Sequence, residues 1–296
     1  MQKQTAPAFS TVATNNALEE ASRLALPERT AWLNSNLSEL PDNLYKYLSL
    51  NPEDNCSVEK LRDTIVNSCL WLSPPTHFND PFDMTLHLEL ERDPIKLRET
   101  MKSGFKRFNP EAGYKARAEF VEKHMANLDG FKQHVHERYR EKIESAGVCC
   151  LSRDPENILM WSHYAEKHTG FAMQFSVVQD VHVFARSLPV EYSQDYPVVL
   201  WPSDSEELNK KIILGKHDGW KYEQEFRIIH NSGSNTLLPF RPEALTGIYI
   251  GCRTPAESFA KLQELLLERK SLGYPAPQLY RVNRHPKKFE LQIEQV

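Results

Sequence analysis

The sequence has few of the features that mark a secreted, metal-binding or membrane protein. Its 296 residues include five cysteines, an odd number, and none of them forms a CxxC pair. We therefore expect no disulfide framework, and the chain fits a reducing, cytoplasmic compartment. The eleven histidines contain no HExxH motif, and we expect no bound metal. No run approaches the roughly 20 apolar residues of a membrane-spanning helix, so no membrane partner is expected.

The overall charge also lacks the excess of basic residues that is typical of nucleic-acid-binding proteins. The formal net charge is −4 and the isoelectric point is about 6.3. Such a chain has no global field that would recruit a polyanion. The sequence therefore gives no strong nucleic-acid signal, although it leaves room for a local basic groove.

Helix and strand patterns follow one another irregularly along the chain. Residues 1–40 are predicted to form an N-terminal helical extension, and residues 41–296 the principal domain. Between about 92 and 144, dense charge with apolar residues at helical spacing predicts a helical insertion. Strands that are interrupted by helices without a regular βαβ period favour a mixed α+β domain with a mostly antiparallel sheet.

The segment 220–229 predicts a β-strand with an ionisable face. Alternation along a strand would point Glu223, Glu225 and Arg227 to one side and Tyr222 to the other. Neighbours on that face are roughly 6.5 Å apart. Two carboxylates at this spacing raise the cost of ionising both, and a nearby cation lowers it. The pattern predicts a site with adjustable pKa values. It is equally typical of a row of charged side chains on the solvent-exposed face of an edge strand.

Other polar residues are embedded in aromatic surroundings. A short apolar strand ending at Ser73 leads into a proline-rich loop, in which Asp80 is expected to accept backbone N–H bonds at the mouth of a cleft. A helix predicted over residues 156–168 supplies two more candidates. The candidate binding residues are Tyr45, Lys46, Tyr47, Ser73, Phe78, Asn79, Asp80, Asp83, His163, Tyr164, Tyr222 and Arg227, and the candidate catalytic residues are Glu223 and Glu225.

Four ordered blocks of this sequence resemble a bacterial family, domain-of-unknown-function family 2971. The blocks are LYKY, LWLS…FNDPFD, CLS…NILMWSHYAEKHTGF and WKYEQEFRII…IYIG, and they extend from about residue 44 to 253. The family has no assigned activity, so this resemblance implies little about chemistry.

The order of three blocks more distantly resembles the site of ADP-ribosyltransferases. These blocks are residues 45–47, Ser73 and the Glu-x-Glu of residues 223–225. The resemblance implies an ADP-ribosyltransferase-like fold, NAD as the substrate, and a role as a bacterial toxin, effector or phage-defence component. It implies that Glu225 stabilises an oxocarbenium ion, that Glu223 orients an unknown acceptor macromolecule, and that Ser73 shapes the site. The first block lacks the Arg or His with which such enzymes hold NAD, so Lys46 or a tyrosine hydroxyl would take that part.

Two alternatives belong to other classes of function. The first is a metal-dependent hydrolase or nuclease, with Asp80, Asp83, Glu223 and Glu225 as Mg²⁺ ligands and Lys46 or His163 assisting. The second is a binding or regulatory module without catalysis, in which residues 79–81 merely cap a turn.

Overall fold

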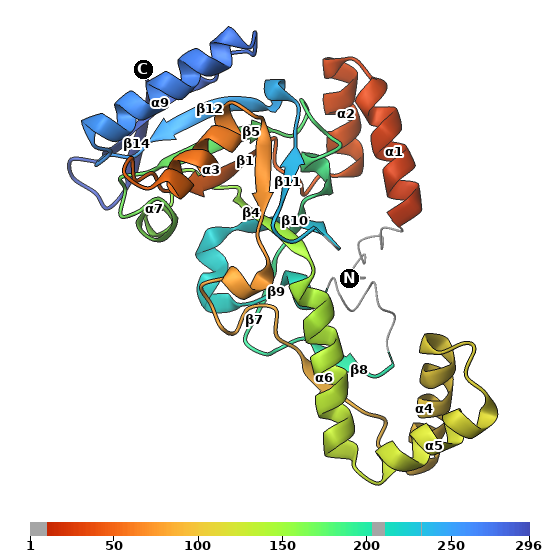
Figure 1. The fold of residues 1–296 in the computed structure, drawn as a ribbon. Coiled ribbons are helices and arrows are strands. Elements are labelled where there is room, and N and C mark those ends of the chain that lie inside the picture. Colours follow the sequence, from red (N-terminus) through yellow and green to blue (C-terminus); the bar gives the residue numbers. More distant parts are fainter. Residues whose placement is uncertain (1–10, 203–210, 232) are drawn as a thin grey trace, which may run out of the picture.

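The computed structural model describes residues 11–202, 211–231 and 233–296, and it has a mixed α+β fold (Figure 1). Among these residues, eight strands form the main sheet, in which every neighbouring pair is antiparallel except β12 with β13. In spatial order the strands are β14 (Leu291–Gln295), β13 (Gln278–Arg284), β12 (Leu245–Ile250), β5 (Phe171–Ser176), β1 (Asn43–Leu48), β4 (Gly147–Ser152), β10 (Glu225–His230) and β6 (Leu188–Pro189). The prediction of a mostly antiparallel α+β fold is confirmed.

Three smaller strand pairs lie outside this sheet in the described part of the chain. They are β2 (Cys69–Leu72) with β11 (Thr236–Pro239), β3 (His87–Glu89) with β8 (Val198–Leu200), and β7 (Glu191–Ser193) with β9 (Gly215–His217). The first pair is antiparallel and the other two are parallel.

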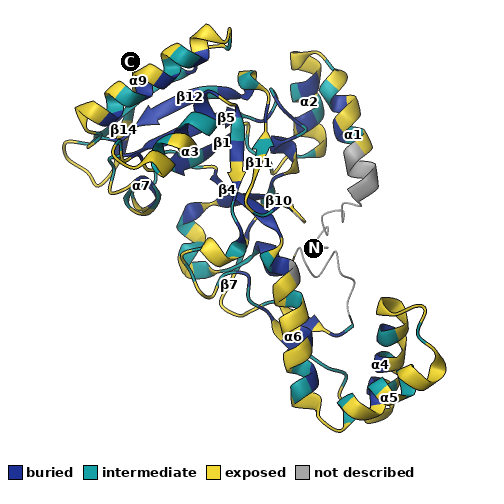
Figure 2. Cartoon of the chain, viewed as in Figure 1, coloured by how far each residue is buried: buried dark blue, intermediate teal, exposed yellow. Residues whose placement is uncertain are grey.

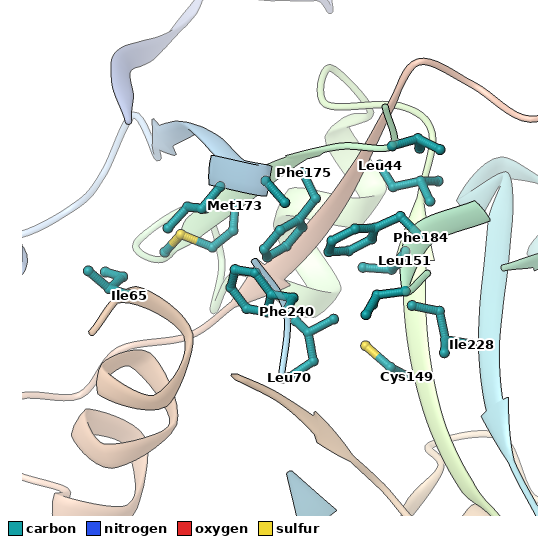
Figure 3. Packing of buried hydrophobic residues seen from close by; sticks show 14 of the residues in the cluster. Leu44, Ile65, Leu70, Cys149, Leu151, Met173, Phe175, Phe184, Ile228 and Phe240 are labelled. Carbon is teal, nitrogen blue, oxygen red and sulfur yellow. The ribbon is translucent and has the colours of Figure 1, made fainter. Parts of the chain in front are cut away.

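One face of the sheet carries the largest hydrophobic core. Figure 3 shows Leu44 of β1, Phe175 of β5 and Ile228 of β10 packed together with residues from the connecting segments. Helices α3 (Asn55–Ile65) and α9 (Ala256–Ser271) contribute to this core. So do α1 (Thr11–Arg23) and α2 (Leu26–Asn36), through Leu18 and Leu33. The N-terminal helices therefore share their core with the sheet.

The opposite face of the sheet packs against α7 (Ile158–Tyr164), which is shorter than the predicted helix of residues 156–168. Asn157 caps the helix by accepting from the backbone N–H groups of residues 159 and 160. Residues 166–168 have positive φ angles of 44°, 56° and 70°. A right-handed helix cannot continue through that conformation, so it ends before Gly170, where the sequence pattern placed its end.

Residues 94–144 form a separate group of three helices, here called the helical arm. It consists of α4 (Pro94–Phe108), α5 (Tyr114–Met125) and α6 (Leu128–Glu144) and lies in sequence between β3 and β4. Met101, Phe131 and Trp201 are buried in a second hydrophobic core at the arm. Figure 1 shows the arm projecting away from the main sheet, and Figure 2 shows that its outer surface is largely exposed.

Candidate functional site

A pocket of about 230 Å³ is bounded by β1, β4, α7 and the loop that follows β2. It brings together segments that are distant in the sequence. The lining residues are Tyr45, Lys46, Tyr47, Ser73, His77, Phe78, Asn79, Asp80, Asp83, Val148, Cys150, Leu151, Ser152, Met160, Tyr164, Lys216, Glu223 and Glu225. All the residues predicted for the site are in this set except His163, Tyr222 and Arg227.

The pocket adjoins a place where two central strands stop pairing. Strands β1 and β4 share one paired position, with Tyr45 opposite Ser152. The ammonium of Lys46 instead donates to the carbonyl of Cys150, with an Nζ–O distance of 3.0 Å. A lysine side chain thus satisfies a backbone acceptor that a longer ladder would have paired. The gap in the ladder exposes side chains of both strands to the pocket.

The prediction of one continuous strand through residues 220–229 is wrong. Residues Asp218–Glu223 form a 3₁₀ helix, η3, and β10 begins at Glu225. Gln224 between them adopts the left-handed conformation, with φ 45° and ψ 51°. The turn begins at the Asp-Gly dipeptide of residues 218 and 219, which is itself a turn signal. Glu225 and Arg227 do share a strand face, whereas Glu223 reaches the pocket from the helix.

Arg227 is fully buried and holds two carboxylates at once. Its Nε and Nη2 donate to the two oxygens of Glu225 over 2.8 and 2.9 Å. Its Nη1 and Nη2 donate to the two oxygens of Asp83 over 3.0 and 2.7 Å. Paired bonds of this kind fix the plane of each carboxylate. Arg227 therefore lies behind the pocket wall and orients two acids that form it.

The sequence prediction missed Lys216, which connects the acids of the pocket. Its ammonium forms a short ion pair with Glu223 and lies 3.1 Å from Glu225 and 3.6 Å from Asp83. The residue lies on the short strand β9. The signal available in the sequence was a lysine only two residues after a buried apolar run, residues 212–214, because a buried lysine needs an acidic partner.

The two glutamates differ in pKa although they are two residues apart. Burial opposes ionisation of Glu225, but the charges of Arg227 and Lys216 outweigh it and lower its pKa to about 2. Burial raises the pKa of Glu223, and the ammonium of Lys216 offsets this effect only in part. We attribute the difference to pairing: Arg227 contacts Glu225 directly, whereas Glu223 shares one ammonium with two other acids. Divergent pKa values in one pocket are the arrangement that acid–base chemistry uses.

Tyr164 completes the environment of Glu223. Its hydroxyl donates to Oε1 of Glu223, while the ammonium of Lys216 contacts Oε2. Burial and the nearby charge of Glu223 raise the pKa of the Tyr164 phenol, which therefore stays protonated near neutral pH. Both oxygens of Glu223 are thus held by donors.

The loop after β2 forms one wall of the pocket, and its predicted local structure is confirmed. Oδ1 of Asp80 accepts a hydrogen bond from the backbone N–H of Phe82 over 2.9 Å. Asp83 is anchored to Arg227, and the ring of Phe78 lies 5.3 Å from the guanidinium of the same arginine. One buried arginine therefore ties the loop to β10.

Two of the three residues outside the pocket are neighbours in sequence of residues that line it. The exposed ring of His163 is 6.3 Å from the half-buried ring of Tyr222. The backbone carbonyl of Tyr222 accepts from the side chain of Asn157, which joins η3 to the start of α7.

The acids of the pocket are arranged for ion pairing within the protein. Among the described residues, no group of three or more His, Cys, Asp or Glu side chains is placed to hold a metal ion. Asp83, Glu223 and Glu225 each contact Lys216. The described part of the chain also has no helix that is long and apolar enough to cross a membrane.

The comparisons with known proteins bear on the segment that holds these acids. Residues 160–228 match the model of the family described as "Protein of unknown function (DUF2971)". This match supports the resemblance to that family and includes Tyr164, Lys216, Glu223, Glu225 and Arg227. No curated protein and no solved structure matches the chain. The resemblance to ADP-ribosyltransferases gains no support from these comparisons.

Proposed function

We propose that the pocket binds the nicotinamide–ribose end of NAD and that the protein transfers ADP-ribose to water or to an acceptor. The observation that carries this proposal is the pair of glutamates with divergent pKa values on the wall of an aromatic-lined pocket. Glu225 is ionised at any physiological pH and is fixed by Arg227. A fixed carboxylate stabilises the oxocarbenium ion that develops when a glycosidic bond breaks.

The second glutamate, Glu223, is suited to activate the nucleophile of such a reaction. Because its pKa is raised, Glu223 exchanges a proton more readily near neutral pH than an ordinary glutamate does. In the proposal, Glu223 orients the attacking hydroxyl or water and takes its proton. Nicotinamide leaves as a neutral molecule and needs no proton from the protein.

Charge and shape favour a cationic, planar ligand. Four acidic side chains, including Asp80, lie at the pocket together with three basic ones, Lys46, Lys216 and Arg227. The formal charge of these side chains is therefore −1. The pyridinium ring of NAD carries the complementary charge, and the rings of Tyr45, Tyr47, Phe78 and Tyr164 line the same space.

The size of the pocket fits one end of a dinucleotide. Its volume of about 230 Å³ is below the roughly 300–1,000 Å³ of sites that enclose a drug-sized ligand. The adenosine end of NAD would accordingly lie outside it. The proposal includes the bacterial toxin, effector or phage-defence role that the resemblance implies.

The first prediction tests Glu225. With purified protein and NAD, we expect nicotinamide release, measured by chromatography, to fall a hundredfold or more in Glu225→Gln, as on loss of one preorganised electrostatic group. Glu243→Gln makes the same chemical change at an exposed position and should keep the wild-type rate. Melting temperatures of both variants check that the fold is retained. Equal rates in the wild type and Glu225→Gln would contradict the assigned role.

Calorimetric titrations separate this proposal from the alternatives. Binding of NAD without any nicotinamide release would favour a binding module. Saturable Mg²⁺ binding that is lost in Glu225→Gln, with no NAD signal, would favour the metal-dependent hydrolase. The ion pairs of Asp83, Glu223 and Glu225 argue against that outcome, because Mg²⁺ would have to displace Lys216.

A further inference from the structure

The charge of the protein is distributed unevenly between the helical arm and the rest of the chain. Residues 94–144 carry a formal net charge of +4, and the remaining residues carry −8. Within the arm, α6 has four basic and four acidic residues, with ion pairs such as Arg140 with Glu144. Helix α4 has five basic residues and one acid, Glu99. The positive excess therefore lies mainly on α4.

The packing of α4 determines which of its faces is turned outward. Leu97 and Met101 are buried in the core of the arm. Gly104 lies against Trp201 so closely that a Cβ at this position would be 2.7 Å from the ring. The face of α4 that carries Leu97, Met101 and Gly104 is therefore turned inward. Four basic residues of the helix are exposed on its other side: Lys96, Lys102, Lys106 and Arg107.

Two exposed aromatic side chains flank the short connection from α4 to α5. Phe108 ends α4 and is 55 % exposed, and Tyr114 begins α5 and is 82 % exposed. The guanidinium of Arg107 lies 6.0 Å from the ring of Phe108. Large aromatic rings this exposed offer open stacking surfaces beside cationic groups.

We propose that this surface, the outer face of α4 with Phe108 and Tyr114, binds single-stranded nucleic acid. Cationic side chains at helical spacing can neutralise successive phosphates, and exposed rings can stack on unpaired bases. A duplex keeps its bases stacked on one another, and an acidic peptide offers no bases, so neither ligand uses the aromatic rings. The acidic remainder of the chain repels a polyanion, which restricts contact to the arm.

This inference is independent of the proposed NAD chemistry, because it concerns binding and requires no turnover. The full chain is titrated into a fluorescein-labelled single-stranded RNA of 20 nucleotides, and fluorescence anisotropy gives the dissociation constant over a range of salt concentrations. We expect saturable binding that weakens steadily with salt. Lys96→Glu/Lys106→Glu should lower the affinity at least tenfold and reduce the slope of log affinity against log salt by roughly 1.4, or about 0.7 per phosphate contact.

The aromatic residues have a different expected signature. Phe108→Ala/Tyr114→Ala should lower the affinity at least tenfold and leave the salt slope unchanged, because stacking releases no counterions. The matched control is Lys60→Glu/Lys270→Glu, two exposed lysines on α3 and α9, far from the arm in Figure 1. This control makes the same change in net charge and should stay within twofold of the wild type.

Several results would overturn the inference. They are equal losses in the arm and control variants, equal affinity for a duplex of the same length, or equally effective competition by polyglutamate. The last result would point to an acidic protein as the partner. Melting temperatures show whether each variant is folded, and substitutions at exposed positions should leave them unchanged.

Discussion

At the scale of single residues, the pocket shows how neighbouring identical side chains acquire different chemistry. Glu223 and Glu225 are both buried, and both contact Lys216. Only Glu225 also receives two hydrogen bonds from Arg227. Because a guanidinium remains charged at all relevant pH values, it keeps Glu225 ionised. Glu223 depends on an ammonium that it shares, so burial dominates its pKa.

The pH dependence of turnover tests this difference. If Glu223 is the base, activity requires its ionised form and is lost as the pH falls through its pKa. Since burial raises that pKa, we expect the acid limb of kcat to lie above pH 4.3, roughly the ordinary value for glutamate. The limb should be absent from the residual activity of Glu223→Gln and unchanged in the exposed control Glu243→Gln, as followed by nicotinamide release between pH 4 and 8. If the acid limb of the pH profile persists in Glu223→Gln, it arises from the titration of another side chain, and the assignment of Glu223 as the base is wrong.

At the scale of elements, one left-handed residue separates η3 from β10. Gln224 has a φ of 45°, which side chains with a branched Cβ adopt only at a cost. This conformation ends the 3₁₀ helix and lets the strand begin at Glu225. The helix is held in place independently, because Ser152 of β4 donates to the carbonyl of Glu223 over 2.7 Å. The change of element at Gln224 thus positions two carboxylates from different directions.

Two substitutions at this residue isolate the backbone effect. Both Gln224→Gly and Gln224→Val remove the hydrogen bond from the side chain to Asp154. Glycine adopts a positive φ without strain, whereas valine does not. We expect Gln224→Val to be less stable than Gln224→Gly by at least about 1 kcal/mol in urea denaturation. Equal stabilities would mean that the left-handed turn is not required for folding.

At the scale of the whole molecule, the N-terminal helices are joined to the sheet through a buried arginine. The guanidinium of Arg29 donates to the carbonyls of residues 21, 22 and 24 and, over 2.9 Å, to that of Val178, two residues after β5. Leu18 and Leu33 lie in the same core as β1 and β5. Helices that share both a core and a charged clamp with the sheet should unfold together with it.

Removal of the clamp should therefore affect the stability of the whole chain. We expect Arg29→Ala to lower the free energy of unfolding by about 2–4 kcal/mol, because buried carbonyl groups lose charge-assisted hydrogen bonds. The unfolding curve should remain a single transition when followed by both circular dichroism and tryptophan fluorescence. Arg23→Ala, which removes an exposed arginine paired with Glu19, should change stability by no more than about 1 kcal/mol. Separate transitions in the wild type would show that the extension unfolds on its own.

The sequence by itself determined the features that depend on local periodicity. Alternation placed Glu225 and Arg227 on one face of β10. Helical spacing indicated the arm, and turn chemistry gave the backbone hydrogen bond to Asp80. Each of these follows from residues within a few positions of one another, where sterics and hydrogen bonding act without help from the rest of the chain.

Only the tertiary structure decided which charges meet. Lys216 contacts an acid from the loop after β2, another from η3 and a third from β10, and no spacing in the sequence encodes that meeting. The opposite pKa shifts of Glu223 and Glu225 follow from burial and from these partners. The net charge of −4 likewise does not show that the helical arm has a net positive charge and the remaining residues a net negative one. A local pattern specifies which way a side chain points, whereas its electrostatic environment depends on every segment that folds against it.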